Sequence, residues 1–241
     1  MSIAPSVTRT DSKAIGSVWR AYLPGVAGLA YVVVWVAGLA IWLVNLALNA
    51  TAGQVAASYR AHPAQAVAQY LLIEGLAGVL LGLVLACMLR AARDRVGRRA
   101  AGPAALSAIA VLTSLSQCVI GLFITTAATA GRTARCGQLS DLVNRLDGVK
   151  MLALAAAAAW LAVTVTVLPR WLRALAVPLG LALIASGCAY LTRSNALAWT
   201  AFISGPLLLL WVAGAGLALT ATARRVQRIP VPVPVPVPAR Y

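Results

Sequence analysis

The sequence contains few of the side chains from which enzyme sites are built. Only five of its 241 residues are Asp or Glu, one is His and four are Cys. A zinc or iron centre needs several His, Cys or carboxylate ligands at short spacing. A nucleophilic triad would have to use His62, which stands beside Pro63 in a predicted loop. We therefore expect no metal, no cofactor and no catalytic triad.

Patterns for nucleotides and nucleic acids are also missing. The chain has neither a GxxxxGK[ST] phosphate loop nor a GxGxxG motif after a strand-like run. Its formal net charge is +15, but the basic residues lie between long apolar runs rather than in one patch. We interpret this charge as a topology signal and expect no nucleic acid partner.

Apolar sequence in long runs dominates the chain. Hydrophobic residues make up 61% and charged residues 10% of it, and the mean hydropathy is +0.88. A spanning helix needs about 20 mostly apolar residues, and backbone groups in hydrocarbon must bond within the segment, which favours helices. We predict an all-α integral membrane bundle of six transmembrane helices, at residues 22–48, 66–89, 104–127, 149–168, 172–191 and 197–219.

Lys and Arg are distributed unequally between alternate connecting segments. Fourteen lie in the N-terminal segment, the second and fourth loops and the C-terminal tail, and six lie in the opposite set. By the positive-inside rule we predict that both termini are cytoplasmic. The domain organisation is then a cytoplasmic segment 1–21, a transmembrane domain 22–221, and a Val-Pro-rich tail 222–241 that we expect to be extended and disordered.

Glu74 is the one carboxylate inside a predicted span. A charged side chain near the bilayer centre costs at least about 2.5 kcal/mol unless it is paired or hydrated. Candidate partners are Lys150, in the first turn of the fourth span, and Arg145 just before it; a water-filled pocket or protonation of Glu74 would also remove the cost. The pattern indicates either a proton-handling or ligand-binding acid or a structural ion pair.

Other polar side chains fall in the same outer half of the predicted bundle, whereas the inner halves of the spans are nearly pure Leu, Val and Ala. We infer a polar pocket that opens outward above a dry inner half, with a structural hydrogen-bond network as the alternative. The candidate ligand-binding residues are Asn45, Tyr70, Gln117, Asn144, Lys150 and Thr200.

The segment 140–151, SDLVNRLDGVKM, holds the densest group of polar residues. Its apolar residues recur at helical spacing, and Ser140 or Asp141 is a predicted helix cap. Asp147 can pair with Lys150 three residues later, or it can act beside Glu74 as the second member of an acid/base pair. Glu74 and Asp147 are thus the candidate catalytic residues.

Three functions are compatible with these residues. We favour a protein that binds a small or lipid-like ligand in the pocket or serves as an accessory membrane subunit. The first alternative is a membrane-embedded enzyme of the isoprenoid or lipid cyclase or hydrolase type that uses Glu74 and Asp147. The second alternative is a small proton-coupled transporter, although no internal repeat is evident.

Cysteine and glycine positions add two expectations. Cys136 and Cys188 both fall at the outer side, where an oxidising exterior would allow a disulfide between them. Small-residue faces let helix backbones approach closely, and we expect them to serve packing within one chain. They comprise Gly75, Gly78 and Gly82 on the second span and Gly25, Gly28, Gly214 and Gly216 on the first and sixth.

A resemblance to uncharacterised multi-pass membrane proteins of high-GC actinobacteria is carried by the C-terminal half. The similar segments are NRLDGVKMLAL (144–154), LPRWLRAL (168–175), ASGCAYL (185–191) and PLLLLWVAGAGLAL (206–219). The resemblance implies a multi-pass protein of the bacterial plasma membrane, surrounded by membrane lipids. It implies no activity and assigns no catalytic residue.

Overall fold

The computed structural model describes residues 9–42 and 46–227. This part of the chain is helical throughout, with short turns and no strand, which confirms the all-α prediction for it. The helices in chain order are α1 (Arg9–Ile41), α2 (Ala52–Ala61), α3 (Pro63–Tyr70), the π-helix η1 (Leu71–Leu76), α4 (Ala77–Val96), the 3-10 helix η2 (Gly97–Ala100), α5 (Ala101–Thr129), α6 (Thr133–Thr164), α7 (Arg170–Thr192), α8 (Asn195–Ala198) and α9 (Ala201–Gln227).

Within the described residues, six helical segments are long and apolar enough to cross a membrane, so the fold is compatible with a multi-pass membrane protein. Each of the six predicted spans overlaps one of them. The segments are Ala21–Ile41, Pro63–Arg93, Ala101–Thr129, Thr133–Thr164, Arg170–Thr192 and Asn195–Arg225.

Several predicted boundaries differ from the structure; α6 ends at Thr164 rather than at Leu168, and α9 continues to Gln227 beyond the predicted Leu219. The first span was expected to reach Leu48, but α1 ends at Ile41, because the chain turns before Thr51 starts α2 with a capping box. The fourth helix begins at Thr133 rather than at a cap on Ser140 or Asp141. Hydropathy did not reveal this extension because its first turns are polar.

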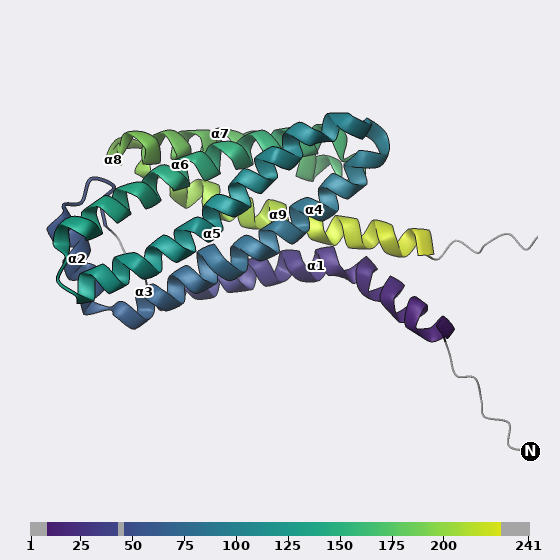
Figure 1. Ribbon diagram of the computed structural model, residues 1–241. Helices are drawn as coiled ribbons and strands as arrows, with labels where there is room; N and C mark the ends of the chain where they lie inside the picture. The colour runs from purple at the N-terminus through teal and green to yellow at the C-terminus, as the bar shows by residue number, and fades with distance from the viewer. Residues whose placement is uncertain (1–8, 43–45, 228–241) are drawn as a thin grey trace, which may run out of the picture.

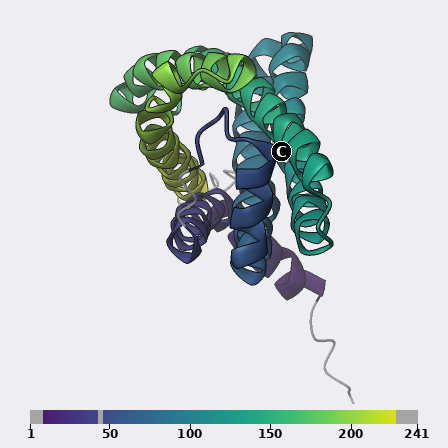
Figure 2. The same ribbon diagram turned by 90° about the vertical axis from the view of Figure 1, so that its left-hand side faces the viewer.

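The six long helices pack in chain order and close into a ring. α1 contacts α4, α4 contacts α5, α5 contacts α6, α6 contacts α7, α7 contacts α9, and α9 returns to α1. Figure 2 shows the bundle from one end, where the six helices are arranged around a common interior. Side chains from helices far apart in the sequence therefore meet at the centre.

The connections fall at two ends of the bundle (Figure 1). One end, here called the α2 end, carries α2, α3, α8 and the turn between α5 and α6. The opposite end, here called the basic end, carries the start of α1, η2, the α6–α7 turn and the end of α9. Both limits of the described chain thus lie at one end, while the assignment of that end to the cytoplasm stays a prediction.

Glycines bring neighbouring helices together, as the small-residue faces predicted. A Cβ on Gly78 of α4 would lie 3.1 Å from the Cβ of Ser114 on α5. A Cβ on Gly216 of α9 would overlap the carbonyl oxygen of Pro24 on α1, and Gly214 instead faces Leu172 of α7. These contacts are intramolecular.

Two apolar clusters divide the interior. The larger runs from the middle of the bundle to the basic end and contains the fully buried Leu85, Met88, Leu161, Leu172 and Trp211. The smaller lies at the α2 end around Trp42, Tyr59, Ile124, Cys136 and Val143. The polar groups described next lie between the two clusters.

Candidate functional site

Glu74 lies in η1, the single π-helical turn between α3 and α4. The N–H of Ala77 donates to the carbonyl of Leu72, five residues earlier. A π turn adds one residue to the helical turn and changes the direction of the side chains that follow. The Glu74 side chain is directed inward and is only 13% exposed.

Lys150 of α6 is the partner of Glu74. Its Nζ lies 3.0 Å from Oε1 and 2.8 Å from Oε2 of Glu74, and 2.8 Å from Oδ1 of Asp147. The sequence left open whether Lys150 pairs with Glu74 or with Asp147, and it pairs with both. We call Glu74, Asp147 and Lys150 the charged cluster.

Two residues of α5 complete the shell around the charged cluster. Ser114 donates from Oγ to Oε2 of Glu74 at 2.6 Å. The amide oxygen of Gln117 accepts from Lys150 Nζ at 2.8 Å, and the amide nitrogen donates to the carbonyl of Val143 at 3.1 Å. Ser114 and Gln117 are three residues apart and therefore share one helix face.

The hydrogen-bond inventory limits what the charged cluster offers to another molecule. An ammonium has three N–H donors, and the hydrogen bonds of Lys150 go to the two oxygens of Glu74 and to Gln117, while Asp147 forms an ion pair with it. Two carboxylates with one ammonium carry a formal charge of −1. The cluster thus presents acceptors and negative charge, and no donor remains on Lys150.

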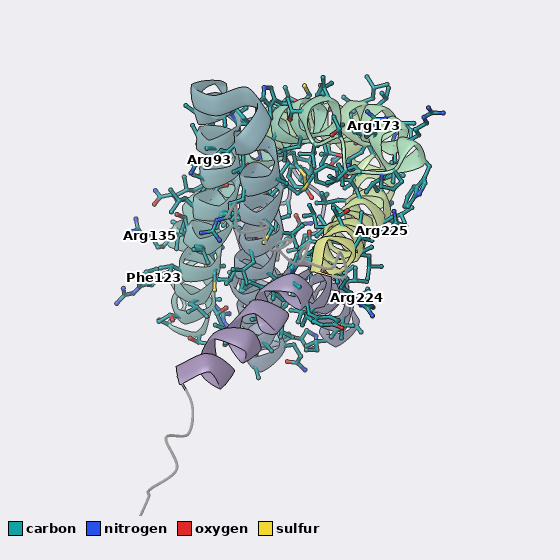
Figure 3. All side chains as sticks on the ribbon, turned by 90° about the vertical axis from the view of Figure 1, so that its right-hand side faces the viewer. Arg93, Phe123, Arg135, Arg173, Arg224 and Arg225 are labelled. Atoms are coloured by element: carbon teal, nitrogen blue, oxygen red, sulfur yellow. The ribbon has the colours of Figure 1, made fainter. Side chains whose placement is uncertain are left out.

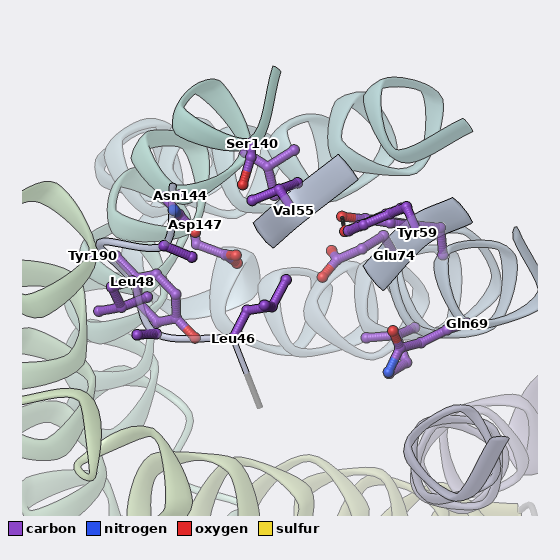
Figure 4. A pocket seen from close by; sticks show the side chains of 15 residues that line it. Leu46, Leu48, Val55, Tyr59, Gln69, Glu74, Ser140, Asn144, Asp147 and Tyr190 are labelled. Atoms are coloured by element: carbon purple, nitrogen blue, oxygen red, sulfur yellow. Dashed lines mark hydrogen bonds between the residues drawn. The ribbon is translucent and has the colours of Figure 1, made fainter. Parts of the chain in front are cut away.

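A close crossing of α6 and α7 positions Asp147. A Cβ on Gly148 would lie 2.9 Å from the carbonyl oxygen of Gly187, and a Cβ on Gly187 would lie 3.1 Å from that of Gly148. The adjacent Asp147 is thereby brought beside Tyr190 of α7 (Figure 4). Figure 4 also shows the carboxylates of Asp147 and Glu74 pointing toward one another from opposite walls of a pocket.

A pair of tyrosines lies next to the cluster at the α2 end. The hydroxyls of Tyr59 on α2 and Tyr70 on α3 are 2.7 Å apart. Burial raises the pKa of Tyr59 above its ordinary value, although the hydrogen bond with Tyr70 lowers it in part. Tyr70 fits only because residue 121 is Gly, since a Cβ there would overlap its ring.

Two cavities meet at the charged cluster. A polar cavity of about 280 Å³ lies toward the α2 end, and Tyr59, Ser140, Asn144 and Tyr190 are among its lining residues (Figure 4). An apolar cavity of about 410 Å³ lies between α1, α4, α6 and α9. Five residues line both cavities, namely Gln69, Ile73, Glu74, Asp147 and Tyr190.

Aromatic and aliphatic side chains form most of the apolar cavity. Trp35, Trp42, Leu154 and Leu208 are among its lining residues. Phe202 also lines it and is 76% exposed, so the cavity reaches the outer surface of the bundle beside α9. In a membrane, that surface faces the acyl chains.

The structure brings most of the predicted site residues together. Tyr70 and Asn144 line the polar cavity, and Gln117 holds Lys150, as described above. Asn45 lies outside the described residues. Thr200 belongs to a separate group, because its hydroxyl lies 3.0 Å from that of Ser186 and donates to the carbonyl of Leu197.

Three site residues were not selected from the sequence. Ser114 was missed because it stands among other small polar residues in the run TSLSQ (113–117), and the sequence does not tell which of them faces inward. Tyr31 lines the apolar cavity but stands in a purely apolar run. Tyr59 was missed because its segment was not predicted to be helical.

The four cysteines are all free thiols. Cys136 is buried, and its Sγ lies 3.8 Å from the carbonyl oxygen of Ile124, while Cys188 is exposed on α7. The disulfide considered between them is therefore not formed. Within the ranges that the structure describes, no group of three His, Cys, Asp or Glu side chains is arranged to hold a metal ion.

Comparison with known proteins gives no relative from which a function can be transferred. No family model matches the chain, and no curated protein and no solved structure is found to be similar to it.

Proposed function

We propose that this protein binds a small amphiphile inside the membrane, with the polar head of the ligand at the charged cluster and its apolar part in the apolar cavity. The observation that carries the proposal is that Glu74 and Asp147 line a polar and an apolar cavity at once. Following the resemblance of the C-terminal half, we place the protein in a bacterial plasma membrane with both termini in the cytoplasm.

The shape of the site supports an amphiphile. Ligand pockets of proteins usually measure about 300–1,000 Å³ and combine an apolar lining with a few convergent polar groups. The apolar cavity of about 410 Å³ falls in this range, and the polar cavity adds about 280 Å³. A molecule that is polar throughout would leave Trp35, Trp42 and Phe202 uncovered.

The charge of the site supports a head group that donates hydrogen bonds, and an ammonium in particular. The charged cluster has a formal charge of −1, and Lys150 has no free donor, as its contacts show. Asp147 contacts Lys150 through Oδ1, and the described part of the chain provides Oδ2 with no partner. An ammonium beside Asp147 would neutralise the cluster, and the rings of Tyr59 and Tyr190 suit a cation.

The geometry is less favourable to the two alternatives. Both oxygens of Glu74 are occupied by Lys150 and Ser114, so an acid/base role would first require these contacts to break. A carrier needs a second access route, but the larger apolar cluster fills the bundle from the charged cluster to the basic end. Ligand binding requires neither change.

The test compares three probes of equal chain length with different heads. Octylamine, octanol and octanoate are added to the full-length protein in nanodiscs, and thermal unfolding is followed. Octylamine should raise the unfolding temperature more than octanol, and octanoate should not raise it. Asp147→Asn should abolish the preference for octylamine.

A matched control lies on the same helix. Asp141 is also an acid of α6, but its side chain is 44% exposed and its Oδ1 pairs with Arg193 at 3.0 Å. Asp141→Asn should keep the wild-type preference. Equal responses of the wild type to all three probes, or equal loss in both variants, would refute the proposal.

A further inference from the structure

A third cavity, larger than the other two, forms a groove on the outside of the bundle between α6 and α7, away from the charged cluster. Its volume is about 1080 Å³, and its floor consists mainly of small residues of α6: Ala155, Ala156, Ala159 and Ala162. Val177 and Leu181 of α7, which are 65% and 66% exposed, form a wall. In a membrane this groove opens toward the acyl chains.

Cations stand at one end of this groove. Arg170 and Arg173 are the charged residues of its lining, and both belong to the first turn of α7, at the basic end. Figure 3 looks onto that end and labels Arg173. The first N–H groups of a helix lack intrahelical acceptors and attract anions. The N-terminus of α7 and the two arginines therefore both favour a negatively charged group at this end of the groove.

Neither arginine is neutralised by a described carboxylate. The carboxylates with described side chains are Glu74, Asp141 and Asp147, and their ion pairs are with Lys150 and Arg193. The Nε of Arg173 is buried without a hydrogen-bond partner. The basic end of the groove thus has positive charge without a counterion among the side chains that the structure describes.

The position of the groove relative to the membrane surface and its length suit one lipid chain. Trp171, between the two arginines, is 54% exposed, and exposed Trp residues are enriched at the membrane–water interface. From Arg170 to Ile184, the last lining residue of α7, the helix rises about 21 Å. One leaflet of the hydrocarbon core is about 15 Å thick, so an acyl chain can lie along the groove with its head group at the arginines.

We propose that this groove is a binding site for an anionic phospholipid, with the phosphate on Arg170 and Arg173 and one acyl chain along the alanine floor. The proposal does not depend on the function proposed for the charged cluster, since the two sites share no lining residue. The occupant is a lipid because the groove is apolar over its length and charged at one end.

The experiment measures lipid retention by native mass spectrometry. Full-length protein is equilibrated with equal amounts of phosphatidylglycerol and phosphatidylcholine, and the retained lipid is counted for each variant. A basic residue near the membrane surface contributes about 1 kcal/mol to binding of anionic lipid, so Arg170→Gln with Arg173→Gln should lower phosphatidylglycerol retention about thirty-fold. Arg224→Gln with Arg225→Gln removes the same charge at the same end but outside the lining of the groove, so it should lower retention far less than the Arg170 and Arg173 pair does.

A second variant tests the acyl chain. A Cβ on Gly180 would meet nothing within 4 Å, and Gly180 lines the groove, so the side chain of Gly180→Leu starts in open space and narrows the groove. It should abolish retention of phosphatidylglycerol, while Gly102→Leu, at another open glycine, should not. Unchanged retention in Gly180→Leu, or an equal loss from the Arg224 and Arg225 pair, overturns the proposal.

Discussion

Replacing Lys150 by Met is the most direct test of the charged cluster. The substitution keeps an unbranched side chain of similar length but leaves Glu74 and Asp147 without their cation. The side chain of Lys150 is 9% exposed, and those of Glu74 and Asp147 are 13% and 17% exposed, so water screens the change poorly. Removing one partner of a buried ion pair costs about 3–5 kcal/mol. For a chain of this size, that corresponds to a loss of about 6–20 °C in the unfolding temperature.

The buried thiols of Cys118 and Cys136 provide the assay. In protein that carries Cys188→Ser, because Cys188 is exposed, a maleimide dye that fluoresces on reaction with a thiol reports their exposure as the protein is heated. Arg145→Met is the control, because Arg145 is an exposed cation of the same helix and its loss should change stability by less than about 0.5 kcal/mol.

A double variant separates lost charge balance from lost packing. Glu74→Gln with Lys150→Met removes one charge of each sign, so it should recover at least half of the stability that Lys150→Met loses. If Lys150→Met behaves like Arg145→Met, or if the double variant is no more stable than Lys150→Met, the cluster is not held by its charges and the reasoning fails.

Three further predictions test the surroundings of the site and the orientation. Gly121→Ala should cost about 1–3 kcal/mol by overpacking against the ring of Tyr70, whereas Gly102→Ala on the same helix should change stability by less than about 1 kcal/mol; equal thermal unfolding of the two variants would contradict this. Burial raises the pKa of Tyr59 in the folded protein. The stability that its neutral hydroxyl contributes is therefore complete below the pKa of Tyr in the unfolded chain, about 10, and is lost as the pH rises beyond that value. The unfolding temperature should thus fall less steeply with pH above about pH 10 in Tyr59→Phe than in the wild type. Equal slopes in the two proteins would contradict the raised pKa of Tyr59. Alkaline phosphatase fused after Tyr241 should be inactive, and green fluorescent protein fluorescent, in a bacterial inner membrane; the reverse would overturn the predicted orientation.

The six helices could be predicted from the sequence because each is marked by the composition of its own residues. About 20 apolar residues identify a span wherever the chain later packs, and a lone acid such as Glu74 stands out in any apolar run. The ion pair with Lys150 was among the predicted arrangements because both residues fall at similar depth. The glycine faces were predictable for the same local reason.

The rest of the site depends on contacts that local patterns do not contain. The π turn that directs Glu74 is a change of register within an ordinary apolar helix, and no residue type marks it. Ser114 is meaningful only opposite Gly78, on another helix. The short helix α2 is too polar to resemble a span, so Tyr59 was not placed beside Tyr70.

The ring of helices has a consequence for biogenesis. Since each long helix neighbours its successor, the first five can assemble as they leave the ribosome, but α1 must wait for α9, the last of the described helices, to cover the glycines at positions 25 and 28. Until then the wall beside Phe202 does not exist, and the interior is open to lipid along its whole height. A nascent chain stalled before residue 201 should therefore be recognised as incomplete by membrane quality-control proteases, whereas a chain that includes α9 should resist them.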